Sequence, residues 1–139
     1  MTLADVINRI NAVAASQPQV GEVIEADVYR LNARKDVRYG VFAWVQGIHR
    51  GSITSDTTAW SFTLVYIDRL TADKSNEKEV QSVGAQVLRN VLMTLYAEGI
   101  IPGDYTLQAF TQRFSDECAG MMCNVTLTAL NDDQCETTY

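Results

Sequence analysis

YGVFAWVQGI at residues 39–48 and WSFTLVYI at residues 60–67 are the two segments that decide the fold of this chain. The first is apolar at consecutive positions, which is typical of a central strand covered on both faces. The second alternates large residues with smaller ones and is also apolar on both faces over its last half. Residues 50–59 between them are rich in Gly, Ser, Thr and Asp, which predicts a hairpin loop longer than a tight turn.

A long helix is predicted after the hairpin. Asn76 is a good N-cap residue, and Glu79 three positions later completes a capping box. Gly99 stands where a left-handed C-cap belongs, and Pro102 prevents continuation of the helix. At 1.5 Å per residue this helix spans about 30 Å. Its apolar stripe comprises Val80, Val83, Gly84, Val87, Leu88, Val91, Leu92 and Leu95.

A shorter helix is predicted at the N-terminal end, capped by Thr2 with Asp5 and ended by the segment before Pro18. A weak strand is expected at 23–31, and two further strands at 104–115 and 119–130. The sequence therefore predicts an α+β fold, with an antiparallel or mixed sheet of four to five strands packed against one long helix and a shorter N-terminal helix. We expect residues 1–130 to form a single domain and residues 131–139 an acidic C-terminal tail.

Charge and cysteine content limit the function. The 139 residues contain 11 Lys and Arg against 17 Asp and Glu, a net charge of −6. Nucleic-acid binders neutralise phosphates with basic residues, so specific nucleic-acid binding is not expected. No apolar run reaches the ~20 residues that span a bilayer, so no membrane partner is expected. Three cysteines without a visible secretory signal predict reduced cytosolic thiols, with Cys123 a small buried hydrophobe.

Catalytic, cofactor and metal sites are not predicted, and we expect no enzyme. His49 is the only histidine, and nothing in the sequence places a nucleophile and an orienting group beside it. Ser52 and Ser55 lie in a turn-like setting. The acidic pairs at 116–117 and 132–133 lie outside apolar runs that would raise a carboxyl pKa. The residues that could suggest a calcium-binding loop are Asp73, Asn76, Glu77 and Glu79. Their spacing lacks the glycine and the terminal acid of an EF-hand loop, so no calcium site is predicted.

The two-sided apolar strands are the main functional lead from the residues themselves. One long helix and one shorter helix cover one face of a sheet, so a second apolar face implies another layer or a partner subunit. The second apolar face therefore favours a protein that assembles with other subunits. The alternative is a small cytosolic ligand-binding or enzymatic α+β domain with a pocket between sheet and helix, for which Tyr29, Tyr39 and Tyr66 supply polar groups.

The order of segments resembles small neck and tail-terminator proteins of tailed bacteriophages, including head–tail connector ring proteins in phages of Bacteroidetes. The resemblance covers roughly residues 1–135 and departs at Gly40, where a proline is expected. It is carried by DVYRLN at 27–32, VRY at 37–39, WSFTLVYIDRL at 60–70, DKSNE at 73–77, VQS at 80–82, FSD at 114–116, AG at 119–120 and Cys135.

The resemblance implies a non-enzymatic virion protein, assembled in the host cytoplasm, that forms a homo-oligomeric ring at the head–tail junction or the tail end. Its partners would be further copies and other neck, portal or tail proteins. An acidic lumen would let DNA pass without binding its phosphates. On this reading the docking loops are residues 50–59 and 71–76, and a further docking segment is formed by residues 131–139. The alternative is that the two loops are merely solvated and that the last segment is a frayed chain end. A baseplate or tail-fibre adaptor is a further alternative.

Overall fold

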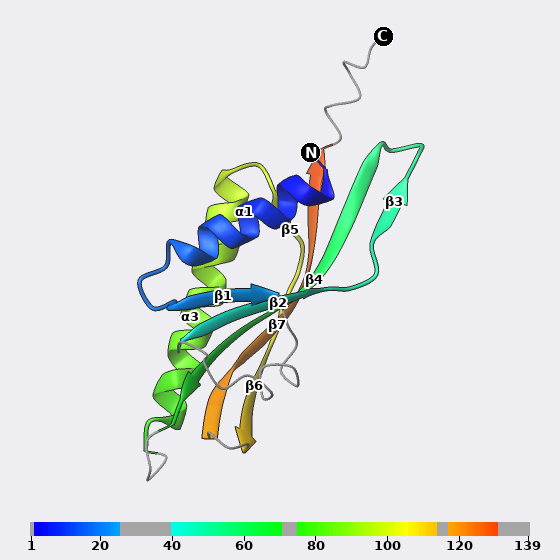
Figure 1. The fold of residues 1–139 in the computed structure, drawn as a ribbon. Helices are drawn as coiled ribbons and strands as arrows, with labels where there is room; N and C mark the ends of the chain where they lie inside the picture. Colours follow the sequence, from blue (N-terminus) through cyan, green and yellow to red (C-terminus); the bar gives the residue numbers. More distant parts are fainter. Residues whose placement is uncertain (1, 26–39, 71–74, 114–116, 131–139) are drawn as a thin grey trace.

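The computed structural model describes residues 2–25, 40–70, 75–113 and 117–130. In this part of the chain a seven-stranded sheet carries two helices on one face (Figure 1). The strand order is β1-β2-β4-β7-β5, with β3 beside β4 and β6 beside β7. The elements are α1 (Leu3–Ala15), β1 (Glu22–Glu25), β2 (Val41–Gln46), β3 (Arg50–Ser52), β4 (Thr57–Arg69), α3 (Glu77–Ala97), β5 (Ile101–Pro102), β6 (Thr106–Arg113) and β7 (Glu117–Leu130).

The α+β class and the mixed sheet are confirmed. Strand β1 runs parallel to β2, and the other pairs are antiparallel. The sheet has more than the predicted four to five strands, because two short ones, β3 and β5, join it. Strand β3 lies in the segment predicted as a loop; its three exposed residues show no apolar alternation and pair with β4 through the backbone. The remainder of the predicted strand at 23–31 beyond Glu25, and the tail at 131–139, lie outside the described residues.

All four helix ends lie where the sequence signals place them, but the predicted side-chain capping bonds form only at α1. At α1 the Asp5 amide donates to Thr2 Oγ1 over 3.2 Å and the Thr2 amide to Asp5 Oδ2 over 2.9 Å, the predicted capping box. The α1 helix ends before Pro18, and Gly99 after α3 has a left-handed φ of 91°. The predicted capping box of α3 is wrong, because Asn76 Nδ2 instead donates to the Arg69 carbonyl over 3.2 Å.

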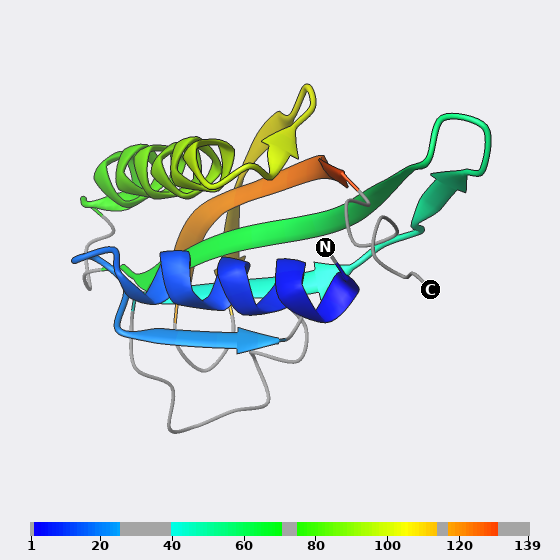
Figure 2. The same cartoon turned by 90° about the horizontal axis from the view of Figure 1, so that it is seen from above.

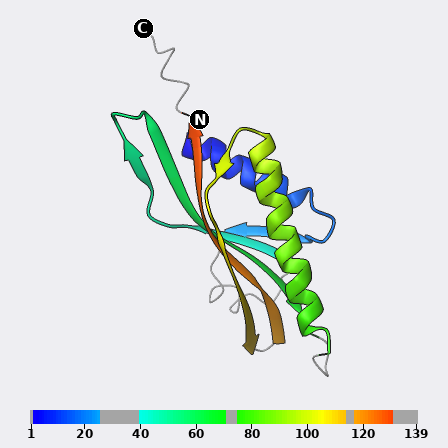
Figure 3. The same cartoon turned by 180° about the vertical axis from the view of Figure 1, so that it is seen from behind.

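The core fills the space between the sheet and the two helices. Tyr66 and its alternate neighbours on β4 face the helices, and α3 covers the middle of the sheet (Figure 3). Buried core side chains comprise Val6, Ile10, Val13, Ala14, Phe42, Trp44, Phe62, Leu64, Tyr66, Val87, Leu88, Val91, Leu92, Leu95, Ile100, Cys123, Val125 and Leu127.

The opposite face of the sheet holds a second, smaller apolar cluster. Val41 and Ala43 of β2 lie there beside Val65 and Ile67 of β4, and all four are buried. The prediction that β2 is apolar and covered on both faces is therefore confirmed for residues 41–44. Because these side chains are buried within one copy, this apolar face does not by itself require a partner subunit.

Strand β7 passes very close to β4 at Gly120. A Cβ there would overlap the Tyr66 carbonyl oxygen and lie 3.0 Å from the Phe110 ring. The Tyr66 carbonyl belongs to the backbone of the paired strand β4, so it cannot move aside without breaking strand pairing. The close approach of β4 and β7 thus requires glycine at this position.

We predict that Gly120→Ala lowers the free energy of unfolding by about 3 kcal/mol or more, because the added methyl must displace backbone rather than a flexible side chain. Urea denaturation followed by circular dichroism measures the change. Gly51→Ala is the matched control: a Cβ at Gly51 lies no closer than 3.7 Å to other atoms, and its effect should stay within about 0.5 kcal/mol. Equal stability of the Gly120 variant and the native protein would contradict the packing described.

Candidate interaction surfaces

A β-bulge separates the body of the sheet from a projecting hairpin. Gln46 pairs with Phe62, whereas Arg50 pairs with Ala59. Three residues, 47–49, therefore lie opposite two on β4, which is one extra residue on the first strand. Such an insertion bends the strand and increases its twist. The segment beyond it, residues 50–61, is here called the hairpin, and it extends away from both helices (Figure 2).

His49 closes the gap that the bulge leaves in the strand pairing. Its Nδ1 accepts from the Ser61 amide over 3.1 Å, while the Gly47 amide donates to the Ser61 carbonyl over 2.8 Å. Because Nδ1 is an acceptor, the proton lies on Nε2, which donates to Gln46 Oε1 over 2.9 Å. The ring also packs edge-on against Trp60, with centroids 5.1 Å apart. His49 therefore has a structural role within the sheet.

The tip of the hairpin presents an isolated apolar side chain to solvent. Ile53 is 98% exposed, and Ile48 at the base of the hairpin is 79% exposed. The turn that holds Ile53 is fixed locally, since the Ser55 amide donates to Ser52 Oγ over 3.3 Å. Asp56 completes the turn with a left-handed φ of 51°, a conformation that Asp tolerates better than most residues.

A second exposed apolar surface lies at the other edge of the sheet. A groove of about 430 Å³ runs between the last turns of α3 and the segment 101–105. We call it the groove; it is lined by Arg89, Leu92, Met93, Tyr96, Ile101, Pro102, Gly103 and Tyr105. Met93 is 56% and Tyr96 64% exposed. Both lie outside the buried stripe of α3, which is the signal that could have revealed the groove from sequence.

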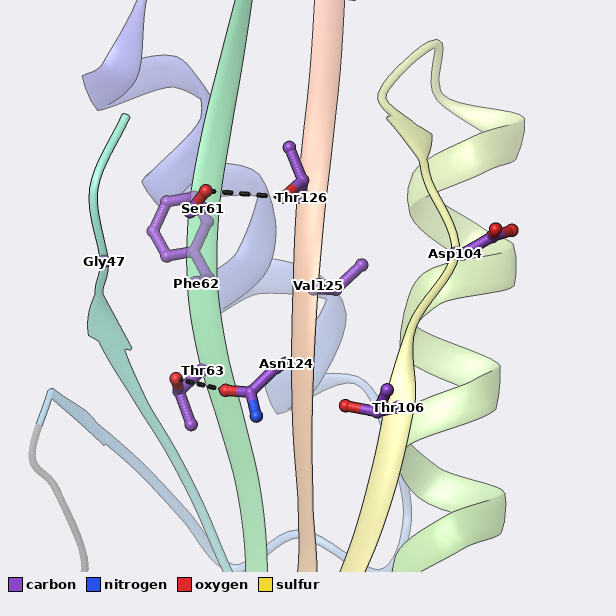
Figure 4. Close-up of a pocket in the computed structure, with 9 residues that line it drawn as sticks. All are labelled: Gly47, Ser61, Phe62, Thr63, Asp104, Thr106, Asn124, Val125 and Thr126. Carbon is purple, nitrogen blue, oxygen red and sulfur yellow. Dashed lines mark hydrogen bonds between the residues drawn. The ribbon is translucent and has the colours of Figure 1, made fainter. Parts of the chain in front are cut away.

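The face of the sheet away from the helices is polar next to the bulge. Thr63 Oγ1 donates to Asn124 Oδ1 over 2.8 Å, and the hydroxyls of Ser61 and Thr126 lie 3.4 Å apart (Figure 4). These cross-strand pairs line a depression of about 330 Å³. Four of its polar side chains bond to one another in these two pairs, and Asp104 and Thr106 line the remainder of the depression.

The other residues singled out from sequence do not converge on one site. Ser52 and Ser55 lie in the hairpin turn, and Glu77 Oε2 accepts from Thr111 Oγ1 over 3.1 Å at the start of α3. Tyr66 and Cys123 are buried in the core. Asp73, Tyr29, Tyr39, Asp116, Asp132, Asp133 and Cys135 lie outside the described residues.

The described ranges also lack two kinds of feature. Among these residues no three His, Cys, Asp or Glu side chains gather in a way that could hold a metal ion. None of the helices described is long and apolar enough to cross a membrane.

We predict that His49→Ala loosens the hairpin by about 1–2 kcal/mol, because the Ser61 amide loses its acceptor and Trp60 loses a ring contact. Native-state hydrogen exchange should show the Ser61 amide exchanging about tenfold faster, with little change in α3. Gln46→Ala is the control, since it removes only the Nε2 partner and keeps the Ser61 contact. Unchanged exchange at Ser61 in the His49 variant would contradict this role.

Two buried groups make the free energy of unfolding depend on pH in the alkaline range. Burial raises the pKa of Cys123 from 9.0 to about 11. Burial, then the charge of Asp68 and a hydrogen bond with it, raise the pKa of Tyr66 from 10.0 to about 12. Because the unfolded chain ionises first, stability is retained below about pH 9 and falls as pH rises, between about 9 and 11 for Cys123 and about 10 and 12 for Tyr66.

The urea concentration at the midpoint of unfolding, measured from pH 8 to 11.5, tests this predicted loss of stability. The native protein should lose stability progressively above pH 9, and Tyr66→Phe should flatten the part of the curve above pH 10 whatever its effect on stability at pH 8. A midpoint that stays constant up to pH 11.5 would contradict the prediction.

Comparisons with known proteins give no family for this chain. No protein-family model matches the sequence, and no curated protein matches it.

Proposed function

We propose that this protein is a structural subunit of a tailed-phage virion that assembles into a homo-oligomeric ring, at the head–tail junction or at the tail end. The sequence resemblance supplies the phage setting, and the observation that carries assembly is the exposed apolar groove, together with the exposed Ile53 at the hairpin tip. Scattered exposed side chains are normal, but the groove gathers Met93, Tyr96 and Ile101 in one place. An apolar groove with exposed aromatic and methionine side chains is typical of a protein-binding surface.

The positions of the two surfaces favour a ring over a symmetric dimer. Strand β3 lies beside β4 on the side of β2, whereas β5 lies at the β7 edge of the sheet. Two different surfaces on opposite sides of a subunit support head-to-tail contacts, which close into a ring when the rotation between copies allows it. A dimer related by a two-fold axis would instead use one surface twice.

The charge of the chain suits a ring through which DNA passes. With a net charge of −6 per copy, a lumen lined by such subunits does not hold phosphates, so DNA moves through it without binding. In this proposal the segments 71–76 and 131–139 contact neighbouring neck, portal or tail proteins.

The alternative of a ligand pocket between sheet and helix has less support. Trp44, Tyr66 and Leu88 are buried in the space where that pocket would lie. Trp44 Nε1 is also occupied, donating to Asn11 Oδ1 of α1 over 2.8 Å. The structure therefore gives no specific observation in favour of a metabolite at this position.

We predict that the purified protein forms a closed oligomer. Light scattering after size-exclusion chromatography should give a mass several times the 15.4 kDa of one chain, and negative-stain electron microscopy should show closed symmetric rings. Purified virions should contain the protein in a fixed copy number. A strictly monomeric protein at about 200 µM, absent from virions, would refute the proposal.

A further inference from the structure

We propose that two copies of this chain pair antiparallel through the free edge of β6, so that one sheet continues into the other across a two-fold axis. The contact uses a third surface, separate from the hairpin and the groove, and it does not depend on the proposed ring. Where the ring forms, the same contact joins each subunit to one in a second ring, because two-fold contacts between rings give dihedral assemblies.

Strand β6 is a long edge strand. It has eight residues, Thr106–Arg113, against an average of about five to six for a strand. It pairs with β7 on one side, and no strand lies on its other side within the described residues (Figure 3). Residues 106–109 and 111 are exposed. The neighbouring β5 has only two residues and ends at Pro102, which cannot donate to an added strand.

The pairing of β7 fixes which backbone groups of β6 point outward. The Gly103 amide donates to the Thr126 carbonyl over 2.8 Å, so Thr126 turns its backbone groups toward this edge. Because these groups alternate in direction along a strand, Asn124 does the same toward its partner Thr106. Every second residue of β6 therefore bonds inward to β7. The residues whose amides and carbonyls point outward are Leu107, Ala109 and Thr111.

The contacts that α3 makes with β6 leave this edge open. Gln81 Nε2 donates to the Phe110 carbonyl over 3.3 Å, and that carbonyl is one of the inward ones. Thr111 Oγ1 donates to Glu77 Oε2 over 3.1 Å, a contact of the side chain alone. Neither contact uses the outward amides and carbonyls, so these groups can bond to a partner strand.

The composition of β6 makes a second copy the partner that fits. Natural sheets protect their edges with charged residues, proline or bulges. Residues 106–112 contain no charged residue, proline or glycine, in a chain whose net charge is −6. Strand β1 at the other end of the strand order carries Glu22 and Glu25 and is protected in the usual way. Two β6 strands, by contrast, can meet with no like charges opposed, although the copies are acidic.

A two-fold axis at Ala109 satisfies the outward groups of both copies. Ala109 then lies opposite Ala109 of the second copy, and Leu107 lies opposite Thr111 of the second copy. Each of these pairs exchanges two hydrogen bonds. Gln108 and Phe110 lie opposite one another on the other face of the sheet. Leu107, which is 41% exposed in one copy, gains a cross-strand neighbour in this arrangement.

Opposite charges at the axis test the pairing. Ala109→Glu places two carboxylates opposite one another, and Ala109→Lys places two ammonium groups there. Each variant alone should weaken the contact at least about tenfold, and light scattering should then give half the mass of the native assembly. An equimolar mixture of the two variants should regain the native mass, because a glutamate then faces a lysine.

Matched substitutions control for charge and folding. Asn8→Glu and Asn8→Lys introduce the same charges on the exposed side of α1, which lies at the β1 end of the sheet (Figure 2), and should keep the native mass. Ala109→Pro removes the outward amide and should halve the mass, whereas Ala109→Thr keeps this amide and should assemble like the native protein. Circular dichroism checks the folding of each variant.

Hydrogen exchange of the native protein gives a second readout that needs no variant. The amides of Leu107, Ala109 and Thr111 should exchange at least about tenfold more slowly at about 200 µM than at about 1 µM, because the contact forms only at the higher concentration. The Gln108 amide bonds within one copy, so its exchange should not depend on concentration. Exchange at Ala109 that is independent of concentration in an oligomeric protein would contradict the pairing.

The outcomes separate this inference from the proposed function. If the native protein is oligomeric and both Ala109→Glu and Ala109→Lys keep its mass, the β6 contact is overturned and the ring proposal stands. A mixture that does not regain the native mass, or equal dissociation by the Asn8 variants, also overturns the contact. A native mass of twice the 15.4 kDa chain that falls to one chain in Ala109→Glu supports the contact and refutes the ring. A strictly monomeric native protein overturns both.

Discussion

The packing of Tyr66 is the constraint on which the rest of the structure depends. Its ring and carbonyl are approached by glycines from three elements of the chain: a Cβ at Gly40 would overlap the ring, one at Gly84 would lie 3.2 Å from it, and one at Gly120 would overlap the carbonyl oxygen. The start of β2, the middle of α3 and strand β7 can therefore all lie close to β4 at the same level. This also accounts for Gly40 where the phage resemblance favours a proline, because a proline has a Cβ and would collide with the same ring.

That close packing at one end of β4 leaves the other end to project. Strand β4 has 13 residues, more than β2 can pair with, so its first half needs another partner. The chain supplies one by adding a single residue at the bulge and reversing at Ile53. The bulge would leave the Ser61 amide unpaired on this side, and His49 supplies the missing acceptor. The role of His49 is thus explained by the need of the Ser61 amide for a hydrogen-bond acceptor.

The sequence predicts the parts of the fold that depend on side-chain periodicity and local caps. The apolar stripe of α3, the Thr2 cap and the two-sided strand β2 are visible because burial selects their residue types. Strand β3 is not visible, because it is held by backbone pairing and its residues are exposed. Asn76 stands at the predicted N-cap position without the predicted capping box; its side-chain amide donates to the Arg69 carbonyl after β4, a contact that no local pattern encodes. The groove was missed because it joins Tyr96 to Ile101 across the helix end.

The apolar surfaces and the acidic charge fit together in one physical argument. Copies that each carry a charge of −6 repel one another at distances comparable with the screening length, about 8 Å in physiological salt. Contacts made mainly of ion pairs would be too weak at an exposed edge to overcome this. An apolar contact gains its free energy from water release and is indifferent to the sign of the charges around it. In the proposed ring, apolar contacts between copies would therefore be compatible with the acidic charge that lets DNA pass without binding.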